Sequence, residues 1–422
     1  MSNKSNQDFL AAADRIGARL CRDALWAGGR CNWLGAAMEP VNGAWKIVQR
    51  TFGPDLYGGT SGIALFLAHL YRQSGERIYA ETARGALRQA ISCCDQIPAA
   101  GRISHYAGAL GIGYASMQVG ELFSDAALCQ QGHQLVQDVL ALDAEPAQGT
   151  DVLSGIAGAI PTLLWMHVQT GQCELLARAV DFGHQLVASA RRAPHGWSWN
   201  TLNLPETQRK HDLTGFSHGA AGIGWALLEL YHATQDTQFH HAASQAFAYE
   251  RHWFNAQQGN WPDFRGLNDG TAQPGAAPGY MAAWCHGAPG IGLSRLRGYV
   301  LLDDAELRTE AEIAIRTTSQ MLDHTAASHQ ENYSLCHGQG GNAELLIYGS
   351  QVLNRPELFE KAAAVGRMGL TRIDAQDAPW PCGVMGAGET PGLLLGTAGI
   401  GYFYLRLYAP METPSVLIIS SN

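Results

Sequence analysis

Seven segments of the chain are apolar over three to four helical turns, and each follows a glycine-rich turn. These turns begin, at intervals of 47 to 68 residues, at Gly59, Gly108, Gly155, Gly219, Gly287, Gly338 and Gly396. The segments that follow, such as GIGWALLELYH and GIGYFYLRLY, are apolar on most faces, which predicts buried helices. A motif that returns at this period indicates a repeat architecture.

More amphipathic stretches, rich in Ala, Glu, Gln and Arg, alternate with the apolar segments. Residues 76–94 and 173–192 are examples, and residues 7–26 form the first of them, which gives seven outer helices to seven inner ones. Such a chain of hairpins covers its inner faces only if its ends meet. We therefore predict an all-α fold, a closed α/α toroid, in a single domain of residues 1–422.

Within this domain, residues 1–50 supply the first outer helix and an extended arm, and residues 51–422 supply the hairpin repeats. Glycine pairs at every inner-helix start permit tight turns and place seven helix N-termini at one end of the barrel, where we expect the site. Two segments lie outside the repeat. Residues 31–55 are expected to form a hairpin or an arm, and residues 260–280 a long loop of functional interest.

Composition excludes some classes of function. The 422 residues are 46% apolar and 15% charged with a net charge of −9, so the chain lacks a basic surface for nucleic acid. No stretch resembles a signal peptide or reaches the roughly 18 apolar residues of a membrane span, and we expect a cytoplasmic protein. Nine scattered cysteines, an odd number, fit reduced thiols better than a disulfide framework.

The sequence Cys-His-Gly occurs twice, in WCHGAPGIG and LCHGQGGN, each time at the turn before an inner helix. If these turns are neighbours in the ring, the thiols of Cys285 and Cys336 converge with the imidazole of His337. Two thiolates and one imidazole suit Zn²⁺, and three protein ligands leave a fourth position for water or substrate. We expect the other seven cysteines to be small buried hydrophobic residues. His286 is not expected to be a ligand, because adjacent side chains diverge.

These segments resemble the signature motifs of the lanthionine synthetase C-like (LanC) cyclases. WCHGAPGIG, SLCHGQGGN and GFSHGAAGIG carry the resemblance, and NWLG, GPDLYGGTSGIALFLA, TDVLSGIAGAI and PGLLLGTAGIGYFYLRL extend it along the chain. The chain looks most similar to the cyclase domain of class II lanthipeptide synthetases, here on its own. The resemblance implies a double α-toroid, a zinc site of two cysteines and one histidine, and a separate dehydratase as partner.

Carried over residue by residue, the resemblance implies that Cys285, Cys336 and His337 are zinc ligands. It assigns His218 to acid/base catalysis and Asp151 to the same site. Histidine is suited to moving a proton between a thiol and carbon near neutral pH. Asp151 would orient that imidazole, although an aspartate before an inner helix is also typical of an N-cap.

One position departs from the family pattern. Stand-alone cyclases of the family often have an arginine a few residues before the first zinc cysteine, where this chain has Met281. Lys210 and His211, just upstream of GFSHG, are the substitutes that the sequence offers. His105 and His195 match no motif and are expected to be structural or at the surface.

We expect a zinc-dependent lanthipeptide cyclase that adds cysteine thiols of a ribosomally made, dehydrated precursor peptide to dehydroalanine or dehydrobutyrine. Two alternatives keep the metal: an enzyme that adds glutathione or another small thiol to dehydroamino acids, and a zinc-stabilised peptide-binding scaffold without turnover. A carbohydrate-active toroid is disfavoured, because glycosidases use paired carboxylates and the turns offer Asp151 without a partner acid at an equivalent position.

Overall fold

The protein is a ring of helices around a filled centre. The structure, a computed structural model, describes residues 3–41, 44–142, 149–207, 210–268, 276–328, 332–384 and 386–420. None of the helices in these ranges is both long and apolar enough to cross a membrane.

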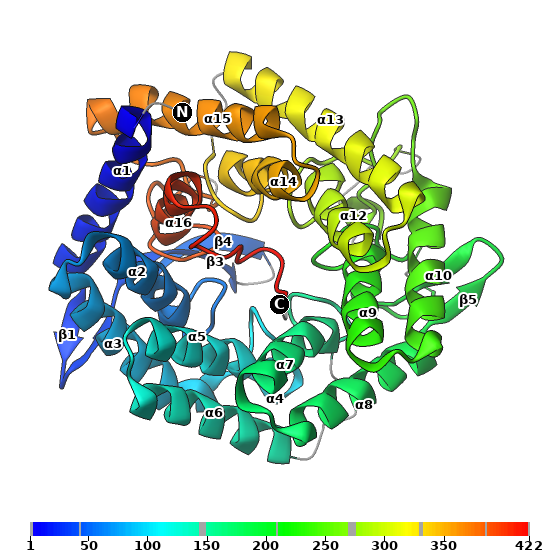
Figure 1. Ribbon diagram of the computed structural model, residues 1–422, viewed down its shortest axis with the longest axis horizontal. Coiled ribbons are helices and arrows are strands. Elements are labelled where there is room, and N and C mark those ends of the chain that lie inside the picture. Colours follow the sequence, from blue (N-terminus) through cyan, green and yellow to red (C-terminus); the bar gives the residue numbers. More distant parts are fainter. Residues whose placement is uncertain are drawn as a thin grey trace.

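The predicted inner helices all form, and they line the ring in chain order (Figure 1). They are α2 (Thr60–Ser74), α5 (Ala109–Leu122), α7 (Ile156–Thr170), α9 (Ala220–Thr234), α12 (Ala288–Leu302), α14 (Gln339–Val352) and α16 (Thr397–Tyr408). Each contacts the next, and α16 contacts α2, so the ring closes. Most of their residues are buried, which is the physical reason for their largely apolar sequences.

The amphipathic stretches form the outer layer, again in the predicted order. The outer helices are α1 (Asn3–Arg22), α3 (Arg77–Ser92), α6 (Ala126–Ala141), α8 (Cys173–Ser189), α10 (Thr237–Trp253), α13 (Ala305–Ser328) and α15 (Pro356–Arg372). The prediction for the first of them was wrong at its ends, because α1 begins before residue 7 and stops at Arg22. The chain then turns into the short strands β1 (Leu25–Ala27) and β2 (Arg30–Asn32).

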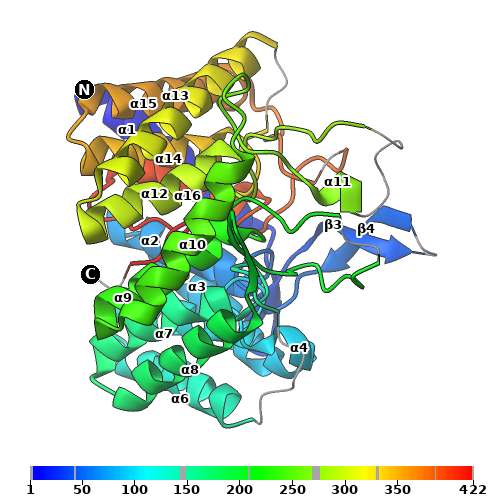
Figure 2. The ribbon, with the colours of Figure 1, turned by 90° about the vertical axis from the view of Figure 1, so that its right-hand side faces the viewer.

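The expected arm is an antiparallel hairpin of β3 (Leu34–Val41) and β4 (Ala44–Thr51), with Leu34 opposite Thr51. Figure 2 shows it projecting from one side of the ring, together with the short helix α11 (Arg265–Asn268). The expected long loop is thus partly helical, while its residues 269–275 lie outside the described ranges. The remaining elements are a small hairpin of β5 (Arg191–Ala193) and β6 (Gly196–Ser198), a short helix α4 (Ala99–Arg102) and two 3-10 helices, η1 (Cys94–Gln96) and η2 (Asp374–Gln376).

The turns before the inner helices bond to one another at the end of the ring that carries the helix N-termini. Backbone N–H groups of one turn donate to a carbonyl of the next turn, and the acceptors are Tyr106, Leu153, Ser217, Cys285, Leu394 and Tyr57. All six acceptors lie two residues before the first glycine of their motif, as does Cys336. Six of the seven pairs of neighbouring turns are linked in this way, and together the turns form a rim, which we call the mouth.

The glycine motif is explained by close backbone approach within these turns. A Cβ atom on Gly222 would lie 1.9 Å from the carbonyl oxygen of Phe216, and one on Gly290 would lie 1.9 Å from that of Trp284. The same clash with the residue six positions earlier recurs at Gly62, Gly111, Gly158, Gly341 and Gly399. Glycine is required there because the helix start packs directly on the mouth.

The C-terminal segment fills the centre of the ring (Figure 1), and Val416–Ile419 are buried there. The Tyr106 hydroxyl donates to the carbonyl oxygen of Val416 at 2.8 Å, and Trp284 Nε1 donates to that of Leu417 at 2.9 Å. Trp284 directly precedes Cys285, so the segment that fills the ring also fixes the turn that carries this thiol.

The close approach at the mouth predicts the effect of Gly222→Ala. The added methyl group cannot avoid the Phe216 carbonyl without a backbone shift, so we expect the free energy of unfolding to fall by about 1–3 kcal/mol, measured by denaturant titration. Gly101→Ala is the control, because a Cβ atom there meets nothing within 4 Å. Equal stability of the two variants would contradict the role of the glycine motif.

Candidate active site

The thiols of Cys285 and Cys336 lie together at the mouth. They occupy equivalent positions in the turns before the adjacent helices α12 and α14, as predicted, and their exposed fractions are 7% and 5%. The two thiols form a side-chain hydrogen bond, which lowers the pKa of Cys285 and raises that of Cys336 well above its usual value. Two buried sulfurs therefore face one another across a seam between turns.

His337 is held by a backbone carbonyl on the far side of its ring. Its Nε2 atom is 3.0 Å from the carbonyl oxygen of Gly383, which can only accept, so Nε2 carries the proton and Nδ1 carries the lone pair. Burial lowers the pKa of His337, which favours the neutral ring. A backbone partner that fixes the tautomer in this way is typical of an imidazole that ligates a metal.

The donor set of these three residues fits Zn²⁺, which prefers thiolate sulfur and imidazole nitrogen. Within the ranges that the structure describes, no group of three or more His, Cys, Asp and Glu side chains is arranged to hold a metal ion. The zinc assignment therefore stays a proposal that rests on the thiol pair and on the tautomer of His337.

Among the remaining cysteines, burial is less uniform than expected. All nine cysteines are free, as predicted. Only Cys31 and Cys382 of the other seven are buried, while Cys173 is exposed and the rest are intermediate. The prediction that all seven are buried hydrophobic residues was therefore wrong, because several lie at the ends of amphipathic outer helices.

His218 and Asp151 are partners, as the sequence predicted. His218 Nδ1 lies 2.6 Å from Asp151 Oδ2, although the two residues come from the turns before α9 and α7. Asp151 Oδ1 also accepts from the Ser154 backbone N–H at 2.7 Å, so the carboxylate closes its own turn as well as orienting the imidazole. It is not the N-cap of α7, which is Gly155. The alternative reading as an N-cap is wrong.

The other histidines near the mouth have structural contacts. His286 stacks on His218 with ring centroids 5.8 Å apart, and its Nδ1 atom donates to the Thr214 carbonyl oxygen at 3.2 Å. Burial lowers its pKa to about 3, so the ring is neutral. His105 is buried and hydrogen-bonded to Thr162, and His195 is an exposed ring stacked on His252.

Arg265 supplies the positive charge that the sequence prediction missed. It begins α11, and it interacts electrostatically with both Cys285 and Cys336. Its Nη2 atom is 2.7 Å from Asp263 Oδ2 and 3.4 Å from the sulfur of Met281.

Lys210 and His211, which the sequence suggested in place of the missing arginine, have other contacts. Lys210 and His211 bond through their backbone N–H groups to Asn268, and the His211 ring packs on Trp253 and Phe264. The only local signal for Arg265 was its place in the unusually long loop before Cys285.

Glu250, from the outer helix α10, holds the turn that carries His218. Its Oε1 atom accepts from the backbone N–H groups of Gly215 at 3.0 Å and Ala221 at 2.8 Å. The carboxyl is fully buried, and burial raises its pKa to about 8. No local pattern in the sequence indicates this role, because a glutamate on an amphipathic helix normally faces solvent.

The turn before α2 adds Tyr57 and Asp55 to the mouth. Tyr57 is hydrogen-bonded through its side chain to Cys336. Asp55 stands in its turn where Asp151 stands in the turn before α7, and it likewise accepts from the N–H three residues on, that of Gly58, at 2.8 Å. The expectation that no acid occupies an equivalent position was therefore wrong.

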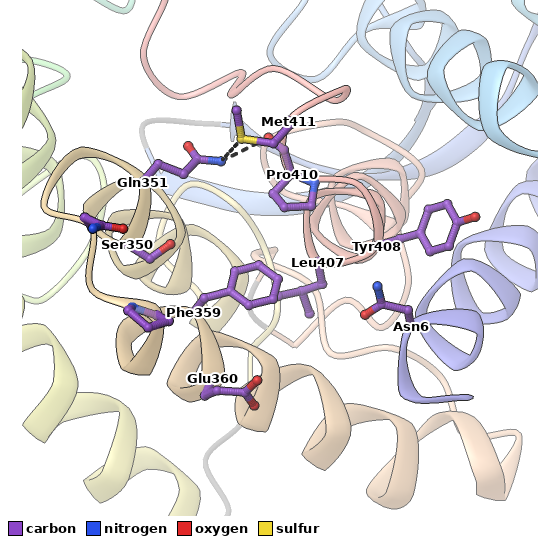
Figure 3. A pocket seen from close by; sticks show the side chains of 11 residues that line it. Asn6, Ser350, Gln351, Phe359, Glu360, Leu407, Tyr408, Pro410 and Met411 are labelled. Carbon is purple, nitrogen blue, oxygen red and sulfur yellow. Dashed lines mark hydrogen bonds between the residues drawn. The ribbon is translucent and has the colours of Figure 1, made fainter. Parts of the chain in front are cut away.

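Cavities at the opposite end of the ring lie away from this chemistry. A pocket of about 540 Å³ is lined by Asn6 and Phe359 and by the C-terminal ends of α14 and α16, including Gln351 and Tyr408 (Figure 3). The thiols stand beyond the N-terminal ends of the inner helices. The candidate site is therefore at the mouth.

The ring and its mouth define an α/α toroid with paired thiols and a carboxylate–imidazole pair at one end. The chain matches the model of the lanthionine synthetase C-like protein family over residues 51–418, and it belongs to that family.

The known proteins that are similar to this chain include a nisin cyclase and a lacticin 481/lactococcin biosynthesis protein. The solved structure of a nisin cyclase superposes with a TM-score of 0.63 at 19% identity, over 86% of this chain and 91% of that chain, which shows a shared fold. A lacticin 481/lactococcin biosynthesis protein of Lactococcus lactis subsp. lactis is 22% identical over 207 residues. That match covers 47% of this chain and 21% of the relative, so it concerns only about a fifth of the relative's length.

The buried carboxyl of Glu250 predicts a pH dependence of stability. Because its pKa is raised in the folded protein, the native state binds more protons than the unfolded chain at pH values between about 4.5 and about 8. The free energy of unfolding should fall as pH rises through this range. Glu250→Gln keeps an oxygen acceptor and cannot ionise, so its stability relative to wild type should increase from pH 5 to pH 8 in denaturant titrations.

The exposed Glu357→Gln serves as the control for this series. Parallel pH profiles of Glu250→Gln and wild type would show that Glu250 does not titrate in the folded protein.

Proposed function

We propose that the protein is a zinc-dependent lanthipeptide cyclase. It would add cysteine thiols of a dehydrated precursor peptide to dehydroalanine or dehydrobutyrine and so form lanthionine or methyllanthionine thioether rings. The observation that carries the proposal is the contact between the buried thiols of Cys285 and Cys336 beside the hydrogen-bonded pair of His218 and Asp151. Membership of the lanthionine synthetase C-like family supports it.

In this proposal Cys285, Cys336 and His337 hold the metal. Zinc, when bound, lowers the pKa of a coordinated thiol and so favours its nucleophilic form. The chain contributes in the same direction, since the positive charge of Arg265 favours the thiolate form of Cys285. A set of three protein ligands leaves room for the thiol of the substrate.

His218 is assigned the proton transfer. Since Asp151 accepts from Nδ1, the Nε2 atom of His218 carries the lone pair and can take the proton of the incoming thiol. The sulfur then bonds to the β-carbon of the dehydro residue, and the double-bond electrons move toward the α-carbon and its carbonyl. The proton returned from Nε2 to the α-carbon completes the addition with no atom lost. Asp151 stabilises the imidazolium in between.

We assign to Arg265 the stabilisation of the negative charge that develops during this addition. As sulfur attacks, charge accumulates on the carbonyl oxygen of the dehydro residue, and a fixed cation next to it lowers the barrier. The ion pair with Asp263 keeps the guanidinium in position. The substrate itself requires an earlier dehydration of Ser or Thr, and we propose that a separate dehydratase supplies it.

Removal of a thiol tests the metal site. We expect one zinc per chain in the purified protein, and loss of both zinc and cyclase activity in Cys336→Ala. Cys382→Ala is the matched control, because Cys382 is also buried but its thiol bonds to the carbonyl oxygen of Thr390. Metal content is measured by elemental analysis. Ring closure leaves the mass unchanged and must be followed by alkylation of the remaining peptide thiols.

Full zinc content in Cys336→Ala would overturn the assignment of this ligand. A zinc-loaded wild-type protein that consumes no peptide thiol would favour a binding scaffold, and one that consumes glutathione in preference would favour a small-thiol transferase.

Removal of the proposed base tests the proton transfer. His218→Ala should retain zinc and lower kcat by roughly 10²–10⁴-fold, the usual contribution of a general acid or base. The exposed His195→Ala should behave as wild type. Unchanged kcat in His218→Ala would exclude this histidine from the proton transfer.

A further inference from the structure

A pocket lies next to the thiol pair, between the β3–β4 hairpin and the mouth. Its volume is about 250 Å³, and its walls come from β3, from Phe52 and Tyr57 before α2, and from Val384 and Leu395 before α16. Most of the lining is apolar or glycine, and the polar groups at its edge are Arg50, Asp55 and Thr390.

Hydrogen bonds connect residues of the pocket wall to residues of the proposed site. Cys336 N donates to the carbonyl oxygen of Leu394 at 2.9 Å, and Leu394 N donates to that of Tyr57 at 2.8 Å. The Tyr57 side chain forms a wall of the pocket and also bonds to Cys336. On the other wall, Gly383 accepts from His337 directly before Val384. Two walls of the pocket are therefore made by residues that position the proposed zinc ligands Cys336 and His337.

A hydrogen bond holds the β3–β4 hairpin over the pocket. Thr390 is buried, and its hydroxyl donates to the carbonyl oxygen of Ala36 in β3 at 3.0 Å. Small residues keep the space open: a Cβ atom on Gly58 would meet only Asp55 Oδ1, at 4.0 Å. Gly58 occupies the position in its turn that His218, His286 and His337 occupy in theirs.

The size of the pocket limits what it can hold. Sites for separate small molecules usually measure roughly 300–1,000 Å³, so this pocket suits one side chain of a larger ligand. An apolar wall favours an apolar side chain, because its transfer from water is favourable. A peptide whose cysteine reaches Cys285 and Cys336 would bring its neighbouring residue to the hairpin.

We propose that this pocket receives an apolar side chain of the precursor peptide, from the residue next to the cysteine that reacts, and so selects which cysteine is used. The inference rests on the proposed function, since it assumes that a peptide cysteine enters at the thiol pair.

The test compares peptides that each contain one dehydroalanine and one cysteine and differ only in having Leu or Gly next to the cysteine, on either side. Wild-type protein should prefer Leu by about tenfold or more in kcat/KM, the usual effect of a filled apolar pocket. In Gly58→Leu, whose side chain would occupy the pocket, the ratio of kcat/KM for Leu over Gly should fall at least about tenfold. Gly58→Ala should give an intermediate ratio.

Gly101→Leu is the matched control, because Gly101 also faces open space and lies in α4, on the same side of the ring as the hairpin (Figure 2). In this variant the ratio of kcat/KM for the Leu peptide over the Gly peptide should equal that of wild type. Equal kcat/KM for the Leu and Gly peptides in wild type, or an unchanged ratio in Gly58→Leu, would overturn the pocket while leaving the cyclase proposal intact.

A photoreactive leucine next to the cysteine separates the two proposals further. Cross-links from this residue should map to β3, Phe52, Val384 or Leu395 in zinc-loaded protein. Cross-links confined to other elements would overturn the pocket. Cross-links at the hairpin without any ring closure would support the pocket and overturn the cyclase reaction.

Discussion

The backbone hydrogen bonds between successive turns at the mouth are the constraint on which the site depends. Six of the seven turns donate N–H groups to the carbonyl of the next turn, for example from Phe216 to Cys285 at 3.2 Å and from Cys336 to Leu394 at 2.9 Å. These bonds satisfy turn groups that are buried by the surrounding helices. They also fix the side chains that project from the turns, because the second glycine of each motif packs against the same turn.

Residues that are far apart in the sequence lie close together because their turns are neighbours in the ring. Asp151 and His218 are 67 positions apart and bond at 2.6 Å, because their turns are neighbours in the ring. The thiols of Cys285 and Cys336 meet for the same reason. At the seam between their turns, side chains add to the connection, since Asn342 Nδ2 donates to the Ala282 carbonyl oxygen at 2.9 Å. The residues of the candidate site thus lie where two repeat units meet.

Charge near the thiols comes from outside the repeat. Arg265 reaches them from the long loop before α12, and Asp263 holds it there. Two histidines close by, His286 and His337, are kept neutral because burial lowers their pKa. Neutral rings do not compete with Arg265 for negative charge. Besides the hydrogen bond from Cys336, Arg265 and His218 both act to lower the pKa of the Cys285 thiol. Pre-organised charge of this kind is effective because little rearrangement is needed during reaction.

The sequence by itself determined the helices, their inner or outer place and the turns that carry the site. Apolar periodicity reports burial, and the repeated glycines report close backbone approach, so the meeting of the two cysteines at equivalent turns could be predicted. The pairing of Asp151 with His218 was expected from the resemblance to the LanC cyclases. Only the tertiary structure decided the contacts of Arg265, Glu250 and Tyr57. Each depends on the path of a loop or on the register between layers, and a local pattern of residues carries no signal for either.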